Sequence, residues 1–168
     1  MADLLIQLKD GEEIHYKNTW VAKKGLVINS KIEFQNELIL LQHLWDIFQR
    51  NGEVLQSDYH LITKNRKSEP LSPTNTIIGD SSLIFIESGA SVEASILNTK
   101  SGPIYIGKNA EVMEGSIIRG PFSLGECAGT KMGSKIYGRT TIGPHCKVVG
   151  EISNCVFQSY SNKGKDGI

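Results

Sequence analysis

The sequence predicts a mainly β fold, a parallel β-helix of hexapeptide repeats that follows a small α+β N-terminal segment. Residues 106–153 repeat every six positions, and an aliphatic residue opens seven of the eight hexapeptides, with Thr130 opening the other. The fifth position is mostly small, as in Ala110, Ala128 and Ser134. A period of six matches neither the turn of an amphipathic helix nor the alternation of an ordinary strand. It is typical of a solenoid in which short strands alternate with turns.

The first part of the chain begins with the pattern of short strands. Apolar side chains alternate over residues 4–8, which predicts a strand, and Asp10-Gly11 predicts the turn after it. A second extended piece follows over residues 20–28, interrupted by a glycine. These pieces are too short and irregular to form an enzyme domain by themselves.

Residues 36–50 have the pattern of an amphipathic helix. Large apolar residues fall on one face at spacings of three and four: Leu38, Leu41, Trp45 and Phe48. Asn36 can cap the start of this helix, and Asn51-Gly52 can end it. We expect the apolar face to pack against the first coil of the β-helix. The polar residues 62–75, which contain two prolines, are expected to be a connector.

In a triangular coil built from three hexapeptides, residues 18 positions apart stack on one another. This spacing predicts three interior ladders: Ile106 on Leu124 on Ile142, Val112 on Thr130 on Val148, and Ile118 on Ile136 on Asn154. The fifth positions form three further stacks: Ala110 on Ala128 on Cys146, Ser116 on Ser134 on Ile152, and Ile104 on Phe122 on Thr140. Thr130 and Asn154 are polar, so each needs a hydrogen-bond partner inside. Gly107, Gly125 and Gly143 stack at the second position, where we expect a positive φ, which costs glycine little.

The period extends upstream of residue 106. Two more hexapeptides open at Ile86 and Val92. The fourteen residues from Val92 to Ile106 make two hexapeptides plus two extra residues. We expect this extra pair in a small loop around residues 98–102. The β-helix then begins near residue 77 and ends near residue 160. This divides the chain into an N-terminal part, residues 1–75, and a β-helix, residues 76–168.

Charge and cysteine content narrow the classes of function. Eighteen basic and eighteen acidic residues cancel, and the pI is about 6.9. We therefore expect neither nucleic acid nor a membrane as a partner. No signal peptide or long apolar run is present, which favours a cytoplasmic protein. The three cysteines lack metal-ligand spacing, and a zinc site built from histidines of several coils is set aside because His145 is the only histidine in the repeats.

Several motifs are more specific than the six-residue period alone. Residues 99–167 contain IYIG, EGS, IRGPF and KMG, followed by YSNKGKDG. With these motifs, the stretch resembles a bacterial family of sugar-phosphate nucleotidyltransferase-like proteins. Its members are similar to the bifunctional N-acetylglucosamine-1-phosphate uridylyltransferase/acetyltransferase and are often labelled glucose-1-phosphate thymidylyltransferases. Upstream, Trp45-Asp46-Ile47-Phe48 and Arg66-Lys67-Ser68 look like the linker between the two domains of that family.

The resemblance implies a Rossmann-like nucleotidyltransferase domain followed by a left-handed β-helix, with Mg²⁺ or acetyl-CoA as cofactors of full-length members. On this comparison, residues 1–75 are a remnant of the first domain, and residues 76–168 are an incomplete left-handed β-helix. The first thirty residues offer Gly11 and Gly25 but no glycine-rich phosphate loop, so we do not expect nucleotide transfer by this chain alone. Solenoids need a terminal cap, and none follows the last repeats. We expect a truncated chain, with a broken gene or a partner that covers the end as the alternatives. Whether the chain is an enzyme stays open.

Five residues are candidates for binding or catalysis. Hexapeptide acyltransferases generally use a histidine as general base, and His145 is the candidate, with an ordinary surface histidine in a turn as the alternative. The family pattern has a histidine where this sequence has Lys165, and a solvated lysine stays protonated at neutral pH, which argues against activity. Arg119, in IRGPF, resembles the arginine that holds a sugar or phosphate in related acetyltransferases. Lys131, Lys163 and Lys165 are candidates for further anion contacts, or edge lysines that discourage aggregation.

Two functions remain open. In the first, the chain is part of a sugar-nucleotide or acyl transferase, inactive alone, whose β-helix contributes sugar or acyl-donor binding at subunit junctions. Its ligand is then a sugar phosphate or a nucleotide sugar. In the second, the chain is a non-catalytic β-helix scaffold for trimerisation. The resemblance implies a homotrimer in both cases, because flat solenoid faces commonly pack three-fold in this fold class.

Overall fold

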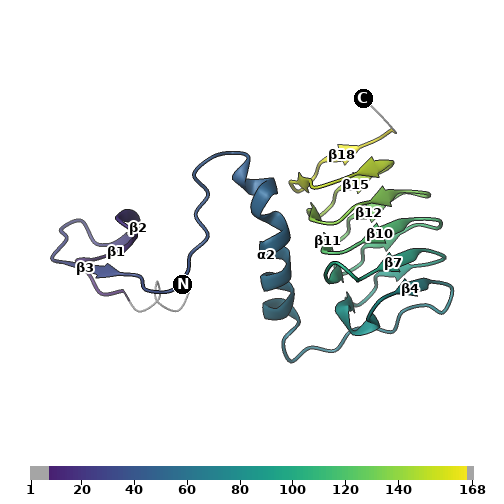
Figure 1. Cartoon of the computed structure of the whole chain (residues 1–168), viewed down its shortest axis with the longest axis horizontal. Helices are drawn as coiled ribbons and strands as arrows, with labels where there is room; N and C mark the ends of the chain where they lie inside the picture. Colours follow the sequence, from purple (N-terminus) through teal and green to yellow (C-terminus); the bar gives the residue numbers. More distant parts are fainter. Residues whose placement is uncertain (1–7, 166–168) are drawn as a thin grey trace. The chain divides into compact units, whose positions relative to one another are not determined.

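The computed structural model describes residues 8–165 and confirms the predicted fold class (Figure 1). Parallel strands stacked in three sheets form a left-handed β-helix, and a small α+β segment precedes it. The chain divides into two compact units, Met1–Leu41 and Gln42–Ile168. The strand expected over residues 4–8 lies outside the described residues, apart from Leu8.

The first unit holds a three-stranded sheet in the order β2-β1-β3. Its strands are β1 (Glu12–Tyr16), β2 (Thr19–Lys24) and β3 (Ser30–Glu33). β1 pairs antiparallel with β2 and parallel with β3. Ile14 is fully buried, and the ring of Tyr16 packs edge-on against Phe34 with 6.4 Å between centroids. This small apolar cluster holds the sheet together.

Three parallel sheets form the walls of the β-helix, and each coil adds one strand to each sheet. The first sheet contains β4 (Thr76–Ile78), β7 (Ile96–Asn98), β10 (Ile117–Arg119), β13 (Lys135–Ile136) and β16 (Glu151–Ile152). The second sheet contains β5 (Ile84–Ile86), β8 (Ile104–Ile106), β11 (Phe122–Leu124), β14 (Thr140–Ile142) and β17 (Val156–Phe157). The third sheet contains β6 (Ser91–Val92), β9 (Glu111–Val112), β12 (Gly129–Thr130), β15 (Lys147–Val148) and β18 (Asn162–Lys163). A short 3-10 helix, η1 (Ser81–Leu83), precedes β5.

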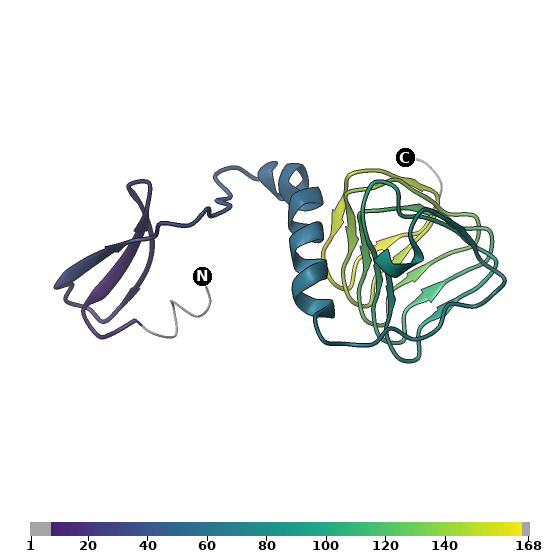
Figure 2. The same ribbon diagram turned by 60° about the horizontal axis from the view of Figure 1, so that its bottom comes forward.

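The chain turns three times in each coil, as the view in Figure 2 shows. The first corner joins the first sheet to the second, the second corner joins the second sheet to the third, and the third corner leads back to the first sheet. The upstream coils are longer than 18 residues, since Ile86 pairs with Ile106 and Leu97 pairs with Ile118. Extra residues lie between β7 and β8, where a loop was predicted over residues 98–102.

The strand register confirms most of the predicted stacks: Ile106–Leu124–Ile142, Val112–Thr130–Val148 and Ile104–Phe122–Thr140. The third ladder is wrong at its last step, because Ile136 pairs with Ile152 and not with Asn154. Ile152 therefore does not lie on Ser134 either. The third corner before Ile152 is two residues shorter than the one before it, and Gly150 makes the tighter turn with a φ of 87°. The six-residue period thus slips once within the stretch where it was expected to be continuous.

The glycines at the second hexapeptide position are required for space, and not for the positive φ that was expected. None of the three has a positive φ: Gly107, Gly125 and Gly143. A Cβ on Gly125 would lie 2.5 Å from the backbone nitrogen of Pro144 in the next coil. A side chain there would push apart coils that the strand hydrogen bonds hold about 4.8 Å from each other. Positive φ occurs two residues after each of these glycines: Asn109, Cys127 and His145.

The interior of the β-helix is a continuous column of apolar side chains. Its fully buried members include Leu97, Ile104, Ile106, Ile118, Phe122, Leu124, Ile142 and Val148. Buried threonines interrupt the column, whereas Asn154 lies after β16 at the first corner. Thr140 Oγ1 donates a hydrogen bond to the carbonyl oxygen of Tyr137 at 2.9 Å. Thr130 Oγ1 and Asn154 Oδ1 are buried without a hydrogen-bond partner among the described residues, so the partners expected for these two side chains are not found there.

The helix predicted over residues 36–50 has the wrong bounds, since α2 spans Asp46–Thr63. Three residues of the predicted apolar face are between 41% and 59% exposed: Leu41, Trp45 and Phe48. The residues of α2 that are buried are Asn51, Gly52 and Tyr59. Asn51-Gly52 therefore lie inside the helix and do not end it. Burial against the β-helix outweighs the low helix propensity of these two residues, because tertiary packing supplies most helical stability in proteins.

Helix α2 packs on the second sheet (Figure 1). Asn51 Nδ2 donates to the carbonyl oxygen of Arg139 at 2.7 Å, and Thr141 Oγ1 donates to Asn51 Oδ1 at 2.8 Å. Gly52 permits the close approach, because a Cβ there would lie 2.6 Å from Arg139 Cγ. In packing terms α2 belongs with the β-helix. The predicted boundary between residues 75 and 76 separates the remnant of a nucleotidyltransferase-like domain from the β-helix. It stays a prediction.

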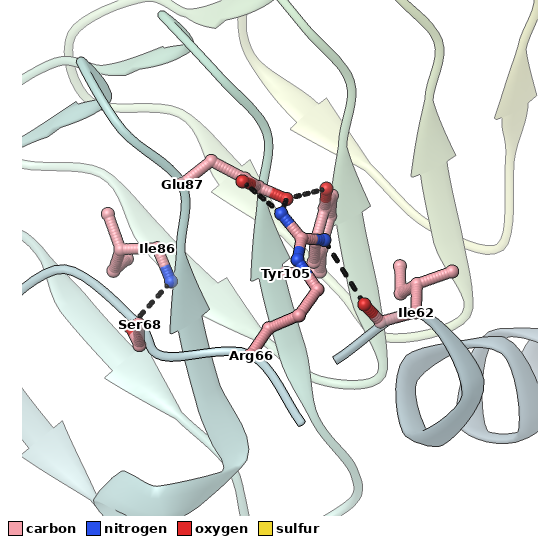
Figure 3. A network of polar contacts seen from close by, with 6 residues as sticks. All are labelled: Ile62, Arg66, Ser68, Ile86, Glu87 and Tyr105. Atoms are coloured by element: carbon pink, nitrogen blue, oxygen red, sulfur yellow. Dashed lines mark hydrogen bonds and ion pairs between the residues drawn. The ribbon is translucent and has the colours of Figure 1, made fainter. Parts of the chain in front are cut away.

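A polar network fastens the segment after α2 to the first coil (Figure 3). Arg66 Nη2 donates to both carboxylate oxygens of Glu87, at 2.7 and 2.6 Å, and Tyr105 donates its hydroxyl hydrogen to Glu87 Oε1 at 2.6 Å. The backbone N–H of Ile86 donates to Ser68 Oγ at 2.8 Å. The connector is therefore fixed against β5 by both an ion pair and a side-chain to backbone hydrogen bond.

The network shifts the proton affinities of its members. Burial raises the pKa of Glu87, but the hydrogen bonds from Tyr105 and Arg66 outweigh burial and leave that pKa below its ordinary value. Burial, together with the hydrogen bond to Glu87, raises the pKa of Tyr105 to about 12. At neutral pH, Glu87 is ionised and Tyr105 is a hydrogen-bond donor, which is the arrangement that the distances require.

Candidate functional site

The residues predicted from the sequence lie at different corners of the β-helix. Arg119 is at the first corner, His145 at the second and Lys131 at the third. Lys163 belongs to β18 in the third sheet, and Lys165 follows it. All of these residues except Lys163 are exposed. The strand register stacks Thr130 on Val148 and Val148 on Lys163, so the three lysines lie around the third corner. Arg119 and His145 lie at other corners, and a single β-helix does not bring them to the lysines.

The imidazole of His145 forms part of a flat aromatic surface. It stacks on the ring of Tyr160, with 4.8 Å between centroids and 7° between planes, and Tyr160 is 77% exposed. Among the residues that the structure describes, no carboxylate hydrogen-bonds to the imidazole. A general base is commonly oriented by such a partner, and residues 8–165 supply none to His145.

The lysines differ in how far they are engaged. Lys163 pairs with Val148 in the third sheet, and its Nζ donates to the carbonyl oxygens of Val149 at 3.0 Å and Lys165 at 2.8 Å. These bonds satisfy carbonyl groups near the end of the described stack and occupy two of the three ammonium hydrogens. The side chain of Lys131 is exposed.

The first corner carries a pocket of about 460 Å³ with Arg119 in its lining. Polar residues of the corner and of α2 surround it: Gln56, Ser101, Arg119, Arg139, Ser153 and Asn154. A neighbouring hollow of about 390 Å³ shares Gln56 and Arg139 with it. The pocket thus combines the predicted Arg119 with a second arginine.

The backbone of Arg139 is fixed on both sides. Its N–H donates to the carbonyl oxygen of Pro121 at 2.8 Å, and its carbonyl oxygen accepts from Asn51 Nδ2 at 2.7 Å. Its φ is 63°, the left-handed region, which a non-glycine residue adopts only when neighbouring contacts hold it there. Within residues 8–165, neither Arg139 nor Arg119 forms an ion pair with a carboxylate.

Sequence reasoning missed Arg139. Counting 18 residues from Arg119 leads to Tyr137, so the repeat did not indicate a second arginine above the first. One signal could have found it: Gly120 and Gly138 are also 18 residues apart, and a Cβ on Gly138 would lie 2.6 Å from the Gly120 carbonyl oxygen. The residue after Gly138 therefore had to lie at the first corner.

Further cavities border α2. One of about 280 Å³ lies between α2 and the second sheet and includes Leu55, Ile62 and Tyr105 in its lining. Another of about 490 Å³ is bordered by Tyr59 and Arg66. The charge of Arg66 is already paired with Glu87 at 2.6 Å, so that cavity offers no unpaired arginine to an anion.

A metal centre is not indicated by the part of the chain that the structure describes. There, no group of three or more His, Cys, Asp or Glu side chains is arranged to hold a metal ion. Cys127, Cys146 and Cys155 are free thiols. No helix among the described residues is long and apolar enough to cross a bilayer.

Comparison with known proteins supports one part of the resemblance. The family model described as sugar nucleotidyl transferase matches residues 3–67. This match covers the first unit, α2 and the start of the connector, and it does not extend to the hexapeptide repeats. The search of the curated proteins returned no match. The N-terminal part is therefore similar to sugar nucleotidyl transferases, at the level of the family and not of a specific member.

Proposed function

We propose that this chain is part of a transferase of the sugar-phosphate nucleotidyltransferase or acyltransferase type, inactive alone, whose β-helix contributes sugar or acyl-donor binding at subunit junctions. The observation that carries the proposal is the order of elements along the chain. The match to sugar nucleotidyl transferases ends at residue 67, and the chain then enters a β-helix that carries an arginine-lined pocket. The ligand proposed is a sugar phosphate or a nucleotide sugar.

The proposed roles of the residues follow from their chemistry. Arg119, Lys131, Lys163 and Lys165 bind anionic groups of the substrate, and His145 takes a proton from the accepting hydroxyl or amine. The lysines lie around the third corner, whereas Arg119 and His145 lie at the first and second corners. All five side chains can therefore act together only when several copies assemble. A homotrimer is therefore part of this proposal.

The cofactors implied by the family fit this chain unequally. Acetyl-CoA is the acyl donor that the proposal expects. Mg²⁺ requires several oxygen ligands, usually including carboxylates, and the described residues hold no cluster of acidic side chains that could bind it. No step of the proposed function is therefore routed through a metal ion in this part of the chain.

A non-catalytic scaffold for trimerisation is the second candidate, and the surface of the first sheet favours it. Ile78, Ile117 and Tyr137 belong to this sheet or directly follow one of its strands, and they are between 37% and 46% exposed. Helix α2 packs on the second sheet, which leaves the first sheet available to a neighbouring copy. A flat face with spaced apolar side chains suits contact with another β-helix.

Ligand binding separates the two candidates. Isothermal titration calorimetry of the full chain with acetyl-CoA, nucleotide sugars and sugar phosphates should show micromolar binding of at least one ligand if the chain is part of a transferase. Sedimentation velocity measures the oligomeric state on the same sample. Absence of binding by all three classes, together with a stable trimer, would refute the transferase proposal and support the scaffold.

A further inference from the structure

We propose that the pocket at the first corner binds the phosphate group of a sugar phosphate within a single chain, between Arg119 and Arg139, with a sugar hydroxyl directed to Asn154. This inference rests on the proposed function and deepens it, because it assigns the phosphate group to two arginines of one chain, while His145 and the lysines still need a neighbouring copy to act with them. It also assigns a role to Arg139 and Asn154, which the sequence did not single out for binding.

The charge of the pocket points to an anion. Arg119 and Arg139 line the same cavity of about 460 Å³, and neither pairs with a carboxylate in the described part of the chain. The acidic residue that shares the neighbouring hollow with Arg139 is Glu53, and its ion pair is with Arg50, at 3.5 Å. Two cationic side chains that line one pocket favour an anion between them.

Arginine is the side chain best suited to a phosphate group. The planar guanidinium can donate two parallel hydrogen bonds to two phosphate oxygens, which fixes orientation as well as supplying charge. The fixed backbone of Arg139 reduces the freedom that this residue loses on binding. A phosphate monoester or inorganic phosphate satisfies this part of the pocket equally well.

The sugar is indicated by a different atom. Asn154 lines the pocket, and its Oδ1 is buried without a hydrogen-bond partner among the described residues. Less than 1 Å² of this oxygen is exposed, so a ligand reaches it only when the Asn154 side chain rotates toward the pocket. A buried acceptor without a partner costs about 1–3 kcal/mol, which rotation toward a ligand hydroxyl would relieve. Phosphate monoesters at neutral pH chiefly accept hydrogen bonds, whereas sugar hydroxyls donate them. The pair of arginines and the unpaired acceptor together fit a ligand with a phosphate at one end and a hydroxyl at the other.

The pocket also has a suitable size and polar supporting residues. Its volume lies within the range of about 300–1,000 Å³ that is usual for small-molecule sites. Gln56 on α2 lines one side and Ser101 another, and both can exchange hydrogen bonds with sugar hydroxyls. Because Gln56 belongs to α2, the site is complete only when the helix is docked on the β-helix.

Calorimetry with three probes tests the inference: glucose 1-phosphate, inorganic phosphate and glucose, each titrated into the full chain. The wild type should bind glucose 1-phosphate most tightly, inorganic phosphate more weakly and glucose least. Arg119→Gln and Arg139→Gln should each weaken glucose 1-phosphate binding by about tenfold or more, the loss expected for one charge-assisted contact. Asn154→Ala should remove the advantage of glucose 1-phosphate over inorganic phosphate.

Lys147→Gln is the matched control, because Lys147 is an exposed basic residue of the third sheet and does not line the pocket. It should leave the affinity within about twofold of wild type. Circular dichroism checks that each variant is folded, and Arg119→Gln, which changes an exposed side chain, keeps the test valid if Arg139→Gln does not fold.

The outcomes separate this inference from the proposed function. If glucose 1-phosphate binds and both arginine variants bind it as wild type does, the pocket assignment is wrong while the transferase proposal stands. If acetyl-CoA or a nucleotide sugar binds but glucose 1-phosphate does not, the inference fails in the same way. If inorganic phosphate binds through the arginines as tightly as glucose 1-phosphate, the sugar contact is overturned. If no ligand of any class binds, both proposals fail.

Discussion

Replacing Thr130 by valine should stabilise the β-helix. Thr130 lies between Val112 and Val148 in an interior ladder and is fully buried. Its hydroxyl has no hydrogen-bond partner among the described residues, and a buried polar group in this state costs about 1–3 kcal/mol. Valine has nearly the same shape and completes an aliphatic ladder. We therefore expect Thr130→Val to raise the free energy of unfolding by about 1 kcal/mol.

Thr140→Val is the matched control, because Thr140 is also a fully buried rung of a ladder but its hydroxyl donates to the carbonyl oxygen of Tyr137 at 2.9 Å. This substitution removes a hydrogen bond and should lower the free energy of unfolding by about 0.5–1.5 kcal/mol. Urea unfolding followed by circular dichroism measures both values, and an unchanged slope with denaturant shows that the same surface is exposed. A destabilised Thr130→Val variant, or equal effects of the two substitutions, would contradict the hydrogen-bond argument.

Three further predictions concern other parts of the structure. Gly125→Ala should lower the free energy of unfolding by about 1–3 kcal/mol in the same assay, because its Cβ would lie 2.5 Å from a backbone nitrogen of the next coil. Gly164→Ala is the control and should be near neutral, since a Cβ there meets nothing within 4 Å. Equal effects of the two substitutions would disprove the steric explanation. Glu87→Gln should destabilise the protein at neutral pH, and its difference from wild type should shrink as the pH falls. The folded-state pKa of Glu87 is below its ordinary value of 4.5. The stability that the carboxylate contributes is therefore fully present above pH 4.5 and is lost as the pH falls through the lowered pKa. If the difference in stability between the variant and the wild type grows on acidification, this explanation is wrong. Asn51→Ala removes the hydrogen bonds that join α2 to the second sheet. It should speed amide hydrogen exchange in α2 by about tenfold or more and leave the interior strands protected. Unchanged exchange in α2 would show that these bonds do not hold the helix.

The elements that could be predicted are those that depend on local repetition. The ladder through Leu124 and the stack through Phe122 follow from side-chain size at fixed spacing, and the register confirms both. Where one corner loses two residues, the prediction failed, and Ile152 took the place assigned to Asn154. The repeat gives the interior positions but does not give the length of each corner, because exposed corners are free to change length without disturbing the core.

The bounds of α2 show a different kind of failure. The apolar pattern over residues 36–50 looked like a buried helical face, yet Trp45 and Phe48 are 52% and 41% exposed. The helix is fixed instead by Asn51 and Gly52, which the sequence marked as a stop. Their partner is Arg139, 88 residues from Asn51 along the chain, and no local pattern reports a contact over that separation.

For the candidate site, the sequence alone indicated Arg119 as a candidate and predicted the parallel β-helix that carries it, because motif and period are local properties of the chain. The tertiary structure decided which residues meet Arg119. It placed Arg139, Asn154 and Gln56 around one pocket and set His145 and Lys131 at other corners. The physical reason is that the neighbours of a corner residue depend on how each coil turns and on where α2 docks, and both are settled by contacts between residues distant in sequence.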